Sequence, residues 1–583
     1  MAERSHQVRI MDSVYENAQG VLIWLGLGDP GIDHIFNSLS SFHSNLNYLH
    51  WRASAYARKT QAQLAKILEV QAHEAEPFGW HVDSGKARII RRNRKPQSFH
   101  TALLQKLDAQ RFERHLMSRT WFHRMWTMQE LLLGPTRTFH CGTRQLDGAR
   151  LLEALRITGL MYNAMYISDD TVYSTLLPSP PDFRKIARFM LLERAWDNYM
   201  AWRKGYKKFD RVTHRMLNRP AYDQMQMNLE LHDTLAHARV KGASEPRDKI
   251  FAMYGLLKRS GIGWSEPDYE VSVEEVYCDA TIRRIRHDKS LDVLCQVTGL
   301  PSELYLPSWV PDWSDRLQPI LPNPASCLAS GGSRVDCHFA KDGLFKVYGR
   351  PVNRVKVLTT SVLFTANKSG TLSRLDTVML AWMKKFLHLK DDHRKRSLGE
   401  IMSARRLVRF SRVLCFDRPP GRHGDAPAMQ MQRIRDYVHL LGSMSGGGTA
   451  SWFDSWTDLE RHLAETPDAK YRSSDVEFGH QSPSRLNKER LRRVMELREQ
   501  LAVSLAQKAY FEAFDGYLGI ASSAIQVGDD IVLLAGLGMP LVVRPVAENL
   551  YRMISPAFVD GYMEGQAWQT EQAILHGQTF NFE

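Results

Sequence analysis

The sequence has no run of about 20 consecutive apolar residues, which is the length that a membrane-spanning helix requires. Its most apolar stretch, residues 531–543, is shorter and contains Gly536, Gly538 and Pro540, so it predicts two strands around a turn. Residues 1–12 carry charges where a secretory signal peptide has its apolar core. We therefore predict neither a membrane span nor export.

Cysteine is scarce, with six scattered thiols in 583 residues. This favours a cytoplasmic protein, or a nuclear one, that has reduced thiols and no structural disulfides. No C-x-x-C pair occurs, and His140-Cys141 and Cys337-His338 lack a second pair at ligand spacing, so no metal site is predicted. The G-x-S-x-G, H-E-x-x-H and Walker motifs are absent too, so the sequence carries no hydrolase or ATPase signature.

The remaining composition is that of ordinary folded proteins, with 43% hydrophobic and 24% charged residues. A chain of 583 residues is too long for one core, so two or three domains are expected. The net charge of +13 and the basic clusters at 86–95, 394–396 and 492–493 allow nucleic-acid binding or an import signal. Few aromatics accompany these clusters, which favours a solvated surface and makes nucleic acid the weakest of the partner hypotheses.

The first secondary-structure elements indicate an α/β layer. Residues 2–18 repeat apolar side chains at helical spacing, and five apolar residues follow at 21–25, as in a strand buried on both faces. Such a strand needs neighbours, and these must come from later in the chain or be missing. Residues 26–31 formally match G-x-G-x-x-G, but no second strand with an acidic end follows, so a strand-to-helix turn is the better interpretation.

An aromatic-rich segment, RTWFHRMWTMQE at 119–130, continues to Leu133 as a predicted helix closed by Gly-Pro. Trp126 and Glu130 are four residues apart and hence share a helical face, with Trp121 close by. A carboxylate among such rings is partly removed from water and could stabilise cationic charge in a bound ligand. The alternative is that the rings only pack and that Glu130 caps the helix or pairs with Arg124 or a neighbouring loop.

Several blocks together resemble the fungal heterokaryon incompatibility (HET) domain. The first is ERSHQV at 3–8 followed by VLIWLG at 21–26, and the second is the aromatic segment at 119–130. Downstream blocks resemble later elements of the same proteins: PRDKIFA at 246–252, PDY at 267–269, LPSWVPDWS at 306–314, and Gly528-Asp529 with Pro540 and Arg544. The residues of this sequence that carry the HET motif are Glu3, Arg4, Gln7, Trp24, Gly26, Trp121, Arg124, Trp126 and Gln129.

The resemblance implies an α/β module like the Toll/interleukin-receptor (TIR) domain, in proteins that trigger cell death when incompatible fungal individuals fuse. In related domains a W-x-x-x-E helix supplies the glutamate that supports cleavage of NAD, which makes Glu130 the catalytic candidate. NAD would then be a substrate, and no bound cofactor is implied. The main function implied is protein interaction in nonself recognition, possible self-association included, and an NAD-cleaving glycohydrolase is the alternative.

Two blocks that precede this region in the family have no counterpart here, so we expect an N-terminally incomplete HET module whose strand at 21–25 lacks its usual neighbours. The expected fold class is a partial TIR-like α/β module followed by a helical middle and an α+β, β-rich C-terminal region. The predicted domains are a partial HET domain (1–148), a helical middle (149–285), an α/β region (286–440), a polar linker or insertion with a helix (441–505) and a β-rich region (506–583).

Overall fold

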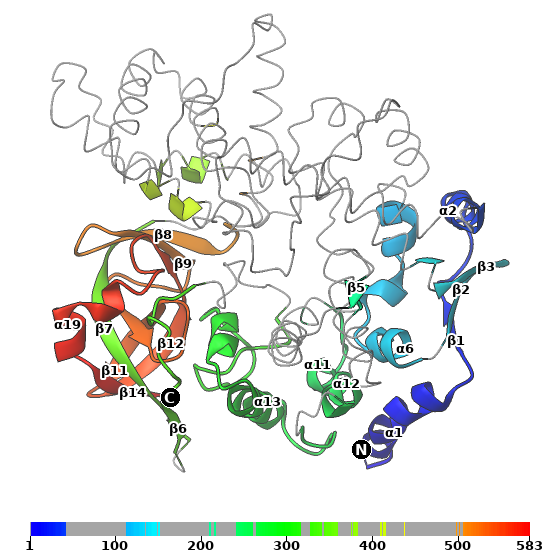
Figure 1. Ribbon diagram of the computed structural model, residues 1–583, viewed down its shortest axis with the longest axis horizontal. Coiled ribbons are helices and arrows are strands. Elements are labelled where there is room, and N and C mark those ends of the chain that lie inside the picture. Colours follow the sequence, from blue (N-terminus) through cyan, green and yellow to red (C-terminus); the bar gives the residue numbers. More distant parts are fainter. Residues whose placement is uncertain are drawn as a thin grey trace, which may run out of the picture. The chain divides into compact units, whose positions relative to one another are not determined.

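The computed structural model shown in Figure 1 divides the chain into two compact units. Unit 1 consists of Met1–Arg283 with Trp313–Gln318, and unit 2 consists of Arg284–Asp312 with Pro319–Glu583. The residues that the structure describes are 2–41, 112–134, 136–148, 150–151, 209–210, 215–216, 239, 241–259, 264–315, 327–340, 343–359, 375, 377–379, 381–382, 409–410, 412–414, 437, 497, 501 and 505–583.

Unit 1 combines helices with short strands. Its elements are α1 (Ala2–Asn17), β1 (Val21–Trp24), α2 (Pro30–Ser41), the π-helix η2 (Phe112–Met117), the 3-10 helix η3 (Thr120–His123), α6 (Thr127–Leu133), β2 (Arg137–Cys141), β3 (Arg144–Asp147), β4 (Phe209–Asp210), β5 (Arg215–Met216), α11 (Asp248–Phe251), α12 (Tyr254–Arg259) and most of α13 (Val273–Asp288). The predicted basic clusters and the polar insertion at 441–505 lie almost entirely outside the described residues.

The strand at 21–24 has its neighbour later in the chain, which was one of the two possibilities that the sequence left open. β1 pairs in parallel with β2, from Val21 opposite Arg137 to Trp24 opposite His140, and β2 pairs antiparallel with β3. The three-stranded sheet of unit 1 therefore has the order β1-β2-β3, with β1 at one end, and β4 and β5 form a separate pair. Helix α6 packs against β1, and a Cβ on Gly134 at its end would lie 2.5 Å from Val21 Cγ2.

The prediction that this strand is buried on both faces is wrong. Val21 and Ile23 are buried, whereas Leu22 and Trp24 expose 75% and 58% of their surface. Helix α6 contacts β1 on the side of Val21, and successive side chains of a strand point to opposite faces. Five apolar residues in a row thus do not distinguish a doubly covered strand from one with an open face.

The aromatic segment is not one continuous helix as predicted. Arg124 is extended, with ψ of 143°, and separates η3 from α6. The break allows a short parallel bridge to Gly242, in which Met125 N donates to Gly242 O at 2.8 Å and Gly242 N donates to His123 O at 2.5 Å. Pairing with a distant segment overrides the local helical pattern here.

Unit 2 is rich in strands. Its described elements are the 3-10 helix η4 (Asp292–Gln296), β6 (Cys337–Phe339), β7 (Phe345–Leu358), β8 (Lys508–Ala513), β9 (Leu518–Ser522), β10 (Asp530–Leu534), β11 (Leu541–Ala547), β12 (Leu550–Pro556), β13 (Phe558–Val559), the 3-10 helix η7 (Ala567–Gln569), α19 (Glu571–Leu575) and β14 (Gln578–Phe582). The two strands predicted within 531–543 are confirmed as β10 and β11. None of the described helices in either unit is both long enough and apolar enough to cross a membrane.

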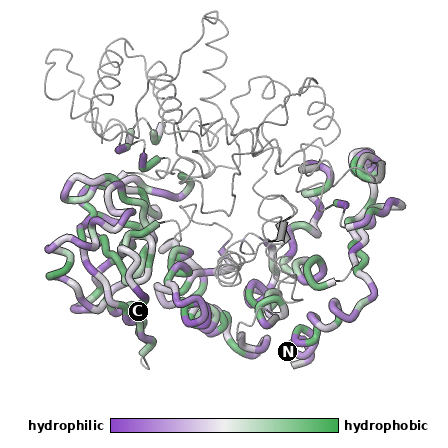
Figure 2. Tube along the Cα trace, viewed as in Figure 1, coloured by the Kyte–Doolittle hydropathy of each residue, from purple (hydrophilic) through white to green (hydrophobic). Residues whose placement is uncertain are grey.

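The long strand β7 organises unit 2. The strand order is β10-β11-β12-β14-β7-β8-β9-β13, and β10 also pairs with β7, so five of the strands form a closed ring. Figure 2 shows both apolar and polar residues along these strands. Buried side chains form a core that includes Phe511, Ile531, Leu533 and Val542.

A buried ion pair closes the turn before β10. Arg544 Nε and Nη2 donate to the two carboxylate oxygens of Asp529 at 2.8 and 2.9 Å, and Gln526 N donates to the same carboxylate at 2.7 Å. Asp529 is 3% exposed. The family blocks that the sequence showed at Gly528-Asp529 and Arg544 thus form one structural unit.

We expect Asp529→Asn to destabilise the β10–β11 region by about 2 kcal/mol, because charge-assisted hydrogen bonds are lost from a buried site. Hydrogen exchange of peptides from β10 and β11, measured by mass spectrometry on the full chain, should become roughly 30-fold faster. The neighbouring Asp530→Asn is the matched control, because its partner Arg354 is 57% exposed and such pairs contribute about 0.2–1 kcal/mol. Equal effects of the two variants would contradict this assignment.

Candidate functional site

Glu130 lies in the first turn of α6 and is half-buried. Its carboxylate accepts a hydrogen bond from Trp121 Nε1 at 2.6 Å. Trp121 is itself buried and makes edge contacts with Phe122 and Phe139, at ring-centroid distances of 5.0 and 5.3 Å. The carboxylate is therefore held by an indole on a packed aromatic layer, and no ion pair joins it to Arg124 in the described part of the chain.

Tyr15 of α1 interacts electrostatically with Glu130, and sequence reasoning assigned it no role. Burial raises the pKa of the Tyr15 phenol, the charge of Glu130 raises it further, and Arg124 opposes the shift. Helix α1, which carries Tyr15, packs on α6, which carries Glu130. The site thus combines a carboxylate, a neutral phenol and a guanidinium.

Trp126, the partner predicted for Glu130 on the same helical face, makes its polar contact elsewhere. Its Nε1 donates to Asp248 Oδ2 at 3.0 Å. Asp248, at the start of α11, is 4% exposed and also accepts from Arg4 Nη2 at 3.1 Å and from the Tyr269 hydroxyl. The Arg4 guanidinium lies 4.0 Å from the centre of the Tyr269 ring, and burial, followed by the hydrogen bond to Asp248, raises the pKa of Tyr269.

Two buried lysines add further hydrogen bonds near Asp248. Lys249 Nζ donates to the carbonyl oxygens of Arg239 and Lys241, and Lys241 Nζ donates to Phe122 O at 2.9 Å. Burial lowers the pKa of Lys241 to about 8. Gln129 is fully buried, and its Nε2 donates to Ala252 O at 2.9 Å. The segment that carries Glu130 is thus attached to residues 239–252 by side chains and backbone.

The loop at 26–31 is a strand-to-helix turn that leads from β1 to α2. Asp29 Oδ1 accepts from Gly31 N at 2.8 Å and from Ile32 N at 3.0 Å, so a carboxylate already occupies the N-terminus of α2. His115 and Arg119 contact the same carboxylate. Burial alone would raise the pKa of Asp29, but these hydrogen bonds and charges lower it. This geometry favours a capped helix over a dinucleotide phosphate site.

The other predicted motif residues have separate positions. Glu3 and Gln7 are exposed on α1, and Trp24 is exposed on β1. Gly26 has a φ of 98°, the left-handed conformation that glycine adopts readily. No described contact joins any of these four residues to Glu130. The structure therefore brings Trp121 together with Glu130, and it brings Arg4 and Trp126 together around Asp248.

Sequence reasoning assigned no role to Tyr15, Asp248 and Tyr269. The last two stand in the PRDKIFA and PDY blocks, where Asp248 lies between Arg247 and Lys249 and Tyr269 lies between Asp268 and Glu270. Charged neighbours do not indicate that a side chain is buried, so the only sequence signal was that both residues belong to the family blocks. Only the fold could show that the donors come from positions 4, 126 and 269.

Comparison with known proteins identifies the family. The heterokaryon incompatibility protein (HET) family matches residues 1–130, and the Het-6 beta-barrel domain family matches residues 484–574. A protein from Neurospora crassa, heterokaryon incompatibility protein 6, OR allele, is 24% identical over 606 aligned residues, which cover 98% of this chain and 80% of that protein. The chain is a HET-domain protein. No solved structure matches it.

The Asp248 carboxylate should be the main polar support of the HET module. We expect Asp248→Asn to weaken its contacts with Arg4, Trp126 and Tyr269 and to cost about 2 kcal/mol. Hydrogen exchange in peptides from α1 and α6 should then accelerate roughly 30-fold. The control is Asp279→Asn, since the Asp279–Arg283 pair is more than a third exposed on both sides and should contribute below about 0.5 kcal/mol. Unchanged exchange in α1 would contradict the role of Asp248.

Lys241 gives the module a testable pH dependence. Its pKa of about 8 in the folded protein is below the usual lysine value, so the unfolded chain binds more protons above pH 8 and stability rises with pH. Between pH 7.5 and 9.5 the free energy of unfolding should rise by about 1–2 kcal/mol relative to Lys241→Met. Urea unfolding of both proteins at the two pH values measures this difference, and a pH-independent difference would rule the effect out.

Proposed function

We propose that this HET-domain protein acts in fungal nonself recognition and triggers cell death through protein contacts. The printed name of the Neurospora crassa relative, heterokaryon incompatibility protein 6, supports this assignment. The observation that carries the contact mechanism is the open face of β1, where Leu22 and Trp24 expose most of their apolar surface. Patches of this kind mark interaction sites in soluble proteins.

The proposed setting is the cytoplasm, with the nucleus as an alternative because of the basic clusters. We also propose that the HET module is TIR-like, which the parallel β1–β2 pair and the helix α2 that follows β1 support. The partners would be other proteins of the cell-death pathway.

NAD cleavage by Glu130 is the second candidate function. Its support is the half-buried carboxylate that Trp121 holds in place beside Tyr15. Loss of nicotinamide leaves an oxocarbenium-like ribose, and an adjacent carboxylate stabilises that positive charge until water adds. The Trp121 hydrogen bond would orient the carboxylate, and the neutral Tyr15 phenol could donate to a ribose or amide oxygen.

One pair of variants separates the two functions. If contacts carry the function, a fungal strain that expresses Glu130→Gln should show the same cell death on fusion with an incompatible strain as wild type does. Glu266→Gln, an exposed acid of unit 1, is the matched control. Nicotinamide release by the purified full chain, lost in Glu130→Gln and kept in Glu266→Gln, would instead establish the enzyme. Absence of both cell death and nicotinamide release in wild type would contradict both functions.

A further inference from the structure

Strand β1 has a backbone edge that pairs with no other strand among the residues that the structure describes. Val21 N donates to Thr136 O and Leu25 N donates to His140 O, each at 2.8 Å, so the odd-numbered residues of this strand face β2. Backbone groups of alternate residues point to opposite edges, so the N–H and C=O groups of Leu22 and Trp24 point away from β2. β1 is the end strand of its sheet, and no strand in the described part of the chain pairs with this edge.

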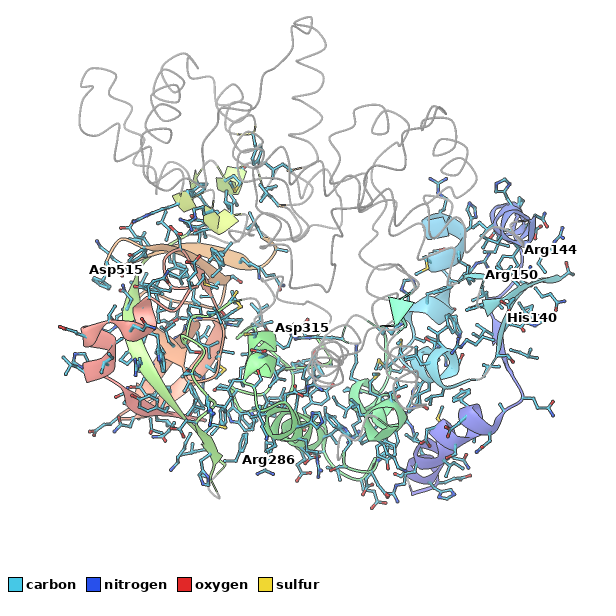
Figure 3. All side chains as sticks on the ribbon, viewed as in Figure 1. His140, Arg144, Arg150, Arg286, Asp315 and Asp515 are labelled. Carbon is cyan, nitrogen blue, oxygen red and sulfur yellow. The ribbon has the colours of Figure 1, made fainter. Side chains whose placement is uncertain are left out.

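The same two residues expose apolar side chains. Leu22 and Trp24 are two positions apart and therefore lie on one face of the sheet. They are 75% and 58% exposed, and their neighbours in the register on β2 are Thr138 and His140. Figure 3 labels His140 on β2 and Arg144 on the adjoining β3. Residues 22 and 24 thus offer both main-chain hydrogen bonds and apolar contact.

Natural edge strands are usually protected from pairing by charged residues, proline or a bulge. Residues 21–28, VLIWLGLG, contain no charge and no proline. An identical strand could therefore approach this edge without repulsion between like charges, whereas a charged partner would find no opposite charge on the strand. This absence of charge favours a second copy of the chain as the occupant.

We propose that β1 pairs antiparallel with β1 of a second copy, across a two-fold axis at Ile23. In this register Leu22 of each copy lies opposite Trp24 of the other, and both pairs use the backbone groups that point away from β2. Four main-chain hydrogen bonds form, and each leucine packs on the opposite indole. Two-fold dimers with self-complementary surfaces are the commonest oligomers. The proposal deepens the proposed function, because it makes a second copy the first contact partner.

The size of the patch predicts a reversible dimer. With roughly 150–250 Å² for a large apolar side chain, Leu22 and Trp24 together expose on the order of 250–300 Å² in each copy. Doubling this area and adding the paired backbone stays below the roughly 1,200 Å² of standard stable interfaces. The dimer should therefore form in a concentration-dependent way, as weak signalling contacts do.

Analytical ultracentrifugation of the full chain over a concentration series tests the dimer. Wild type should shift from monomer to dimer, and Trp24→Lys should raise the dissociation constant at least tenfold by placing two charges in the interface. Leu575→Lys, at an 80% exposed leucine of unit 2, should dimerise like wild type. Hydrogen exchange of β2 and α6 confirms that the Trp24 variant is folded. A wild type that stays monomeric, or a folded Trp24→Lys that dimerises unchanged, would overturn the proposal.

Cysteine pairs test the register. In the proposed register residues 22 and 24 form a hydrogen-bonded antiparallel pair, whose Cα atoms lie about 5.5 Å apart, which suits a disulfide. A mixture of Leu22→Cys and Trp24→Cys chains should therefore form a 22–24 disulfide between copies, identified by peptide mass. Either variant alone should not cross-link at these sites, because its two cysteines would be diagonal neighbours, which lie roughly 7–8 Å apart. Efficient cross-linking of either single variant, or none in the mixture, would refute this register.

The dimer and the proposed function can fail independently. A monomeric protein that still causes cell death on fusion would overturn the dimer and leave nonself recognition standing. A dimeric protein without any cell-death response would confirm the β1 contact and contradict the proposed function.

Discussion

The HET module depends on one buried carboxylate. Asp248 is almost fully removed from water, and it is stabilised because Arg4, Trp126 and Tyr269 all donate to it. A buried charge without such donors would cost several kcal/mol. The four residues come from α1, the start of α6, the start of α11 and a later loop, so one charge joins segments up to 265 positions apart in the chain. The family match ends at residue 130, but the structural module extends well beyond it.

The two tryptophans near Glu130, Trp121 and Trp126, therefore have different structural roles. Trp126 supports the frame through Asp248, whereas Trp121 positions Glu130. The buried lysines also join segments, since Lys249 and Lys241 donate hydrogen bonds to backbone carbonyl oxygens where η3, the bridge at Gly242 and α11 meet. These contacts support both the half-buried Glu130 carboxylate and the edge of β1. Catalysis would use the carboxylate, whereas protein contact would use the strand edge.

Unit 2 has a different fold, but it too contains a buried carboxylate that joins separate segments. Its ring of strands closes because β7 is long enough to pair with β10, β14 and β8. The Asp529–Arg544 pair then fixes the turn that leads into β10 and ties it to β11. In both units, acids from the short family blocks are buried and meet their donors only in the folded chain.

The sequence by itself determined the elements with strong local patterns. The helix at 2–18, the strand at 21–25 and the pair within 531–543 all follow from periodicity and turn residues, which act over a few positions. It also named Glu130 as a candidate, which stays a prediction, and the family blocks identified the HET domain. Only the tertiary structure decided that one face of β1 stays open, that Arg124 breaks the aromatic helix and that Trp126 binds Asp248. Each of these depends on a partner more than 100 residues away, and local pattern carries no information about contacts at that separation.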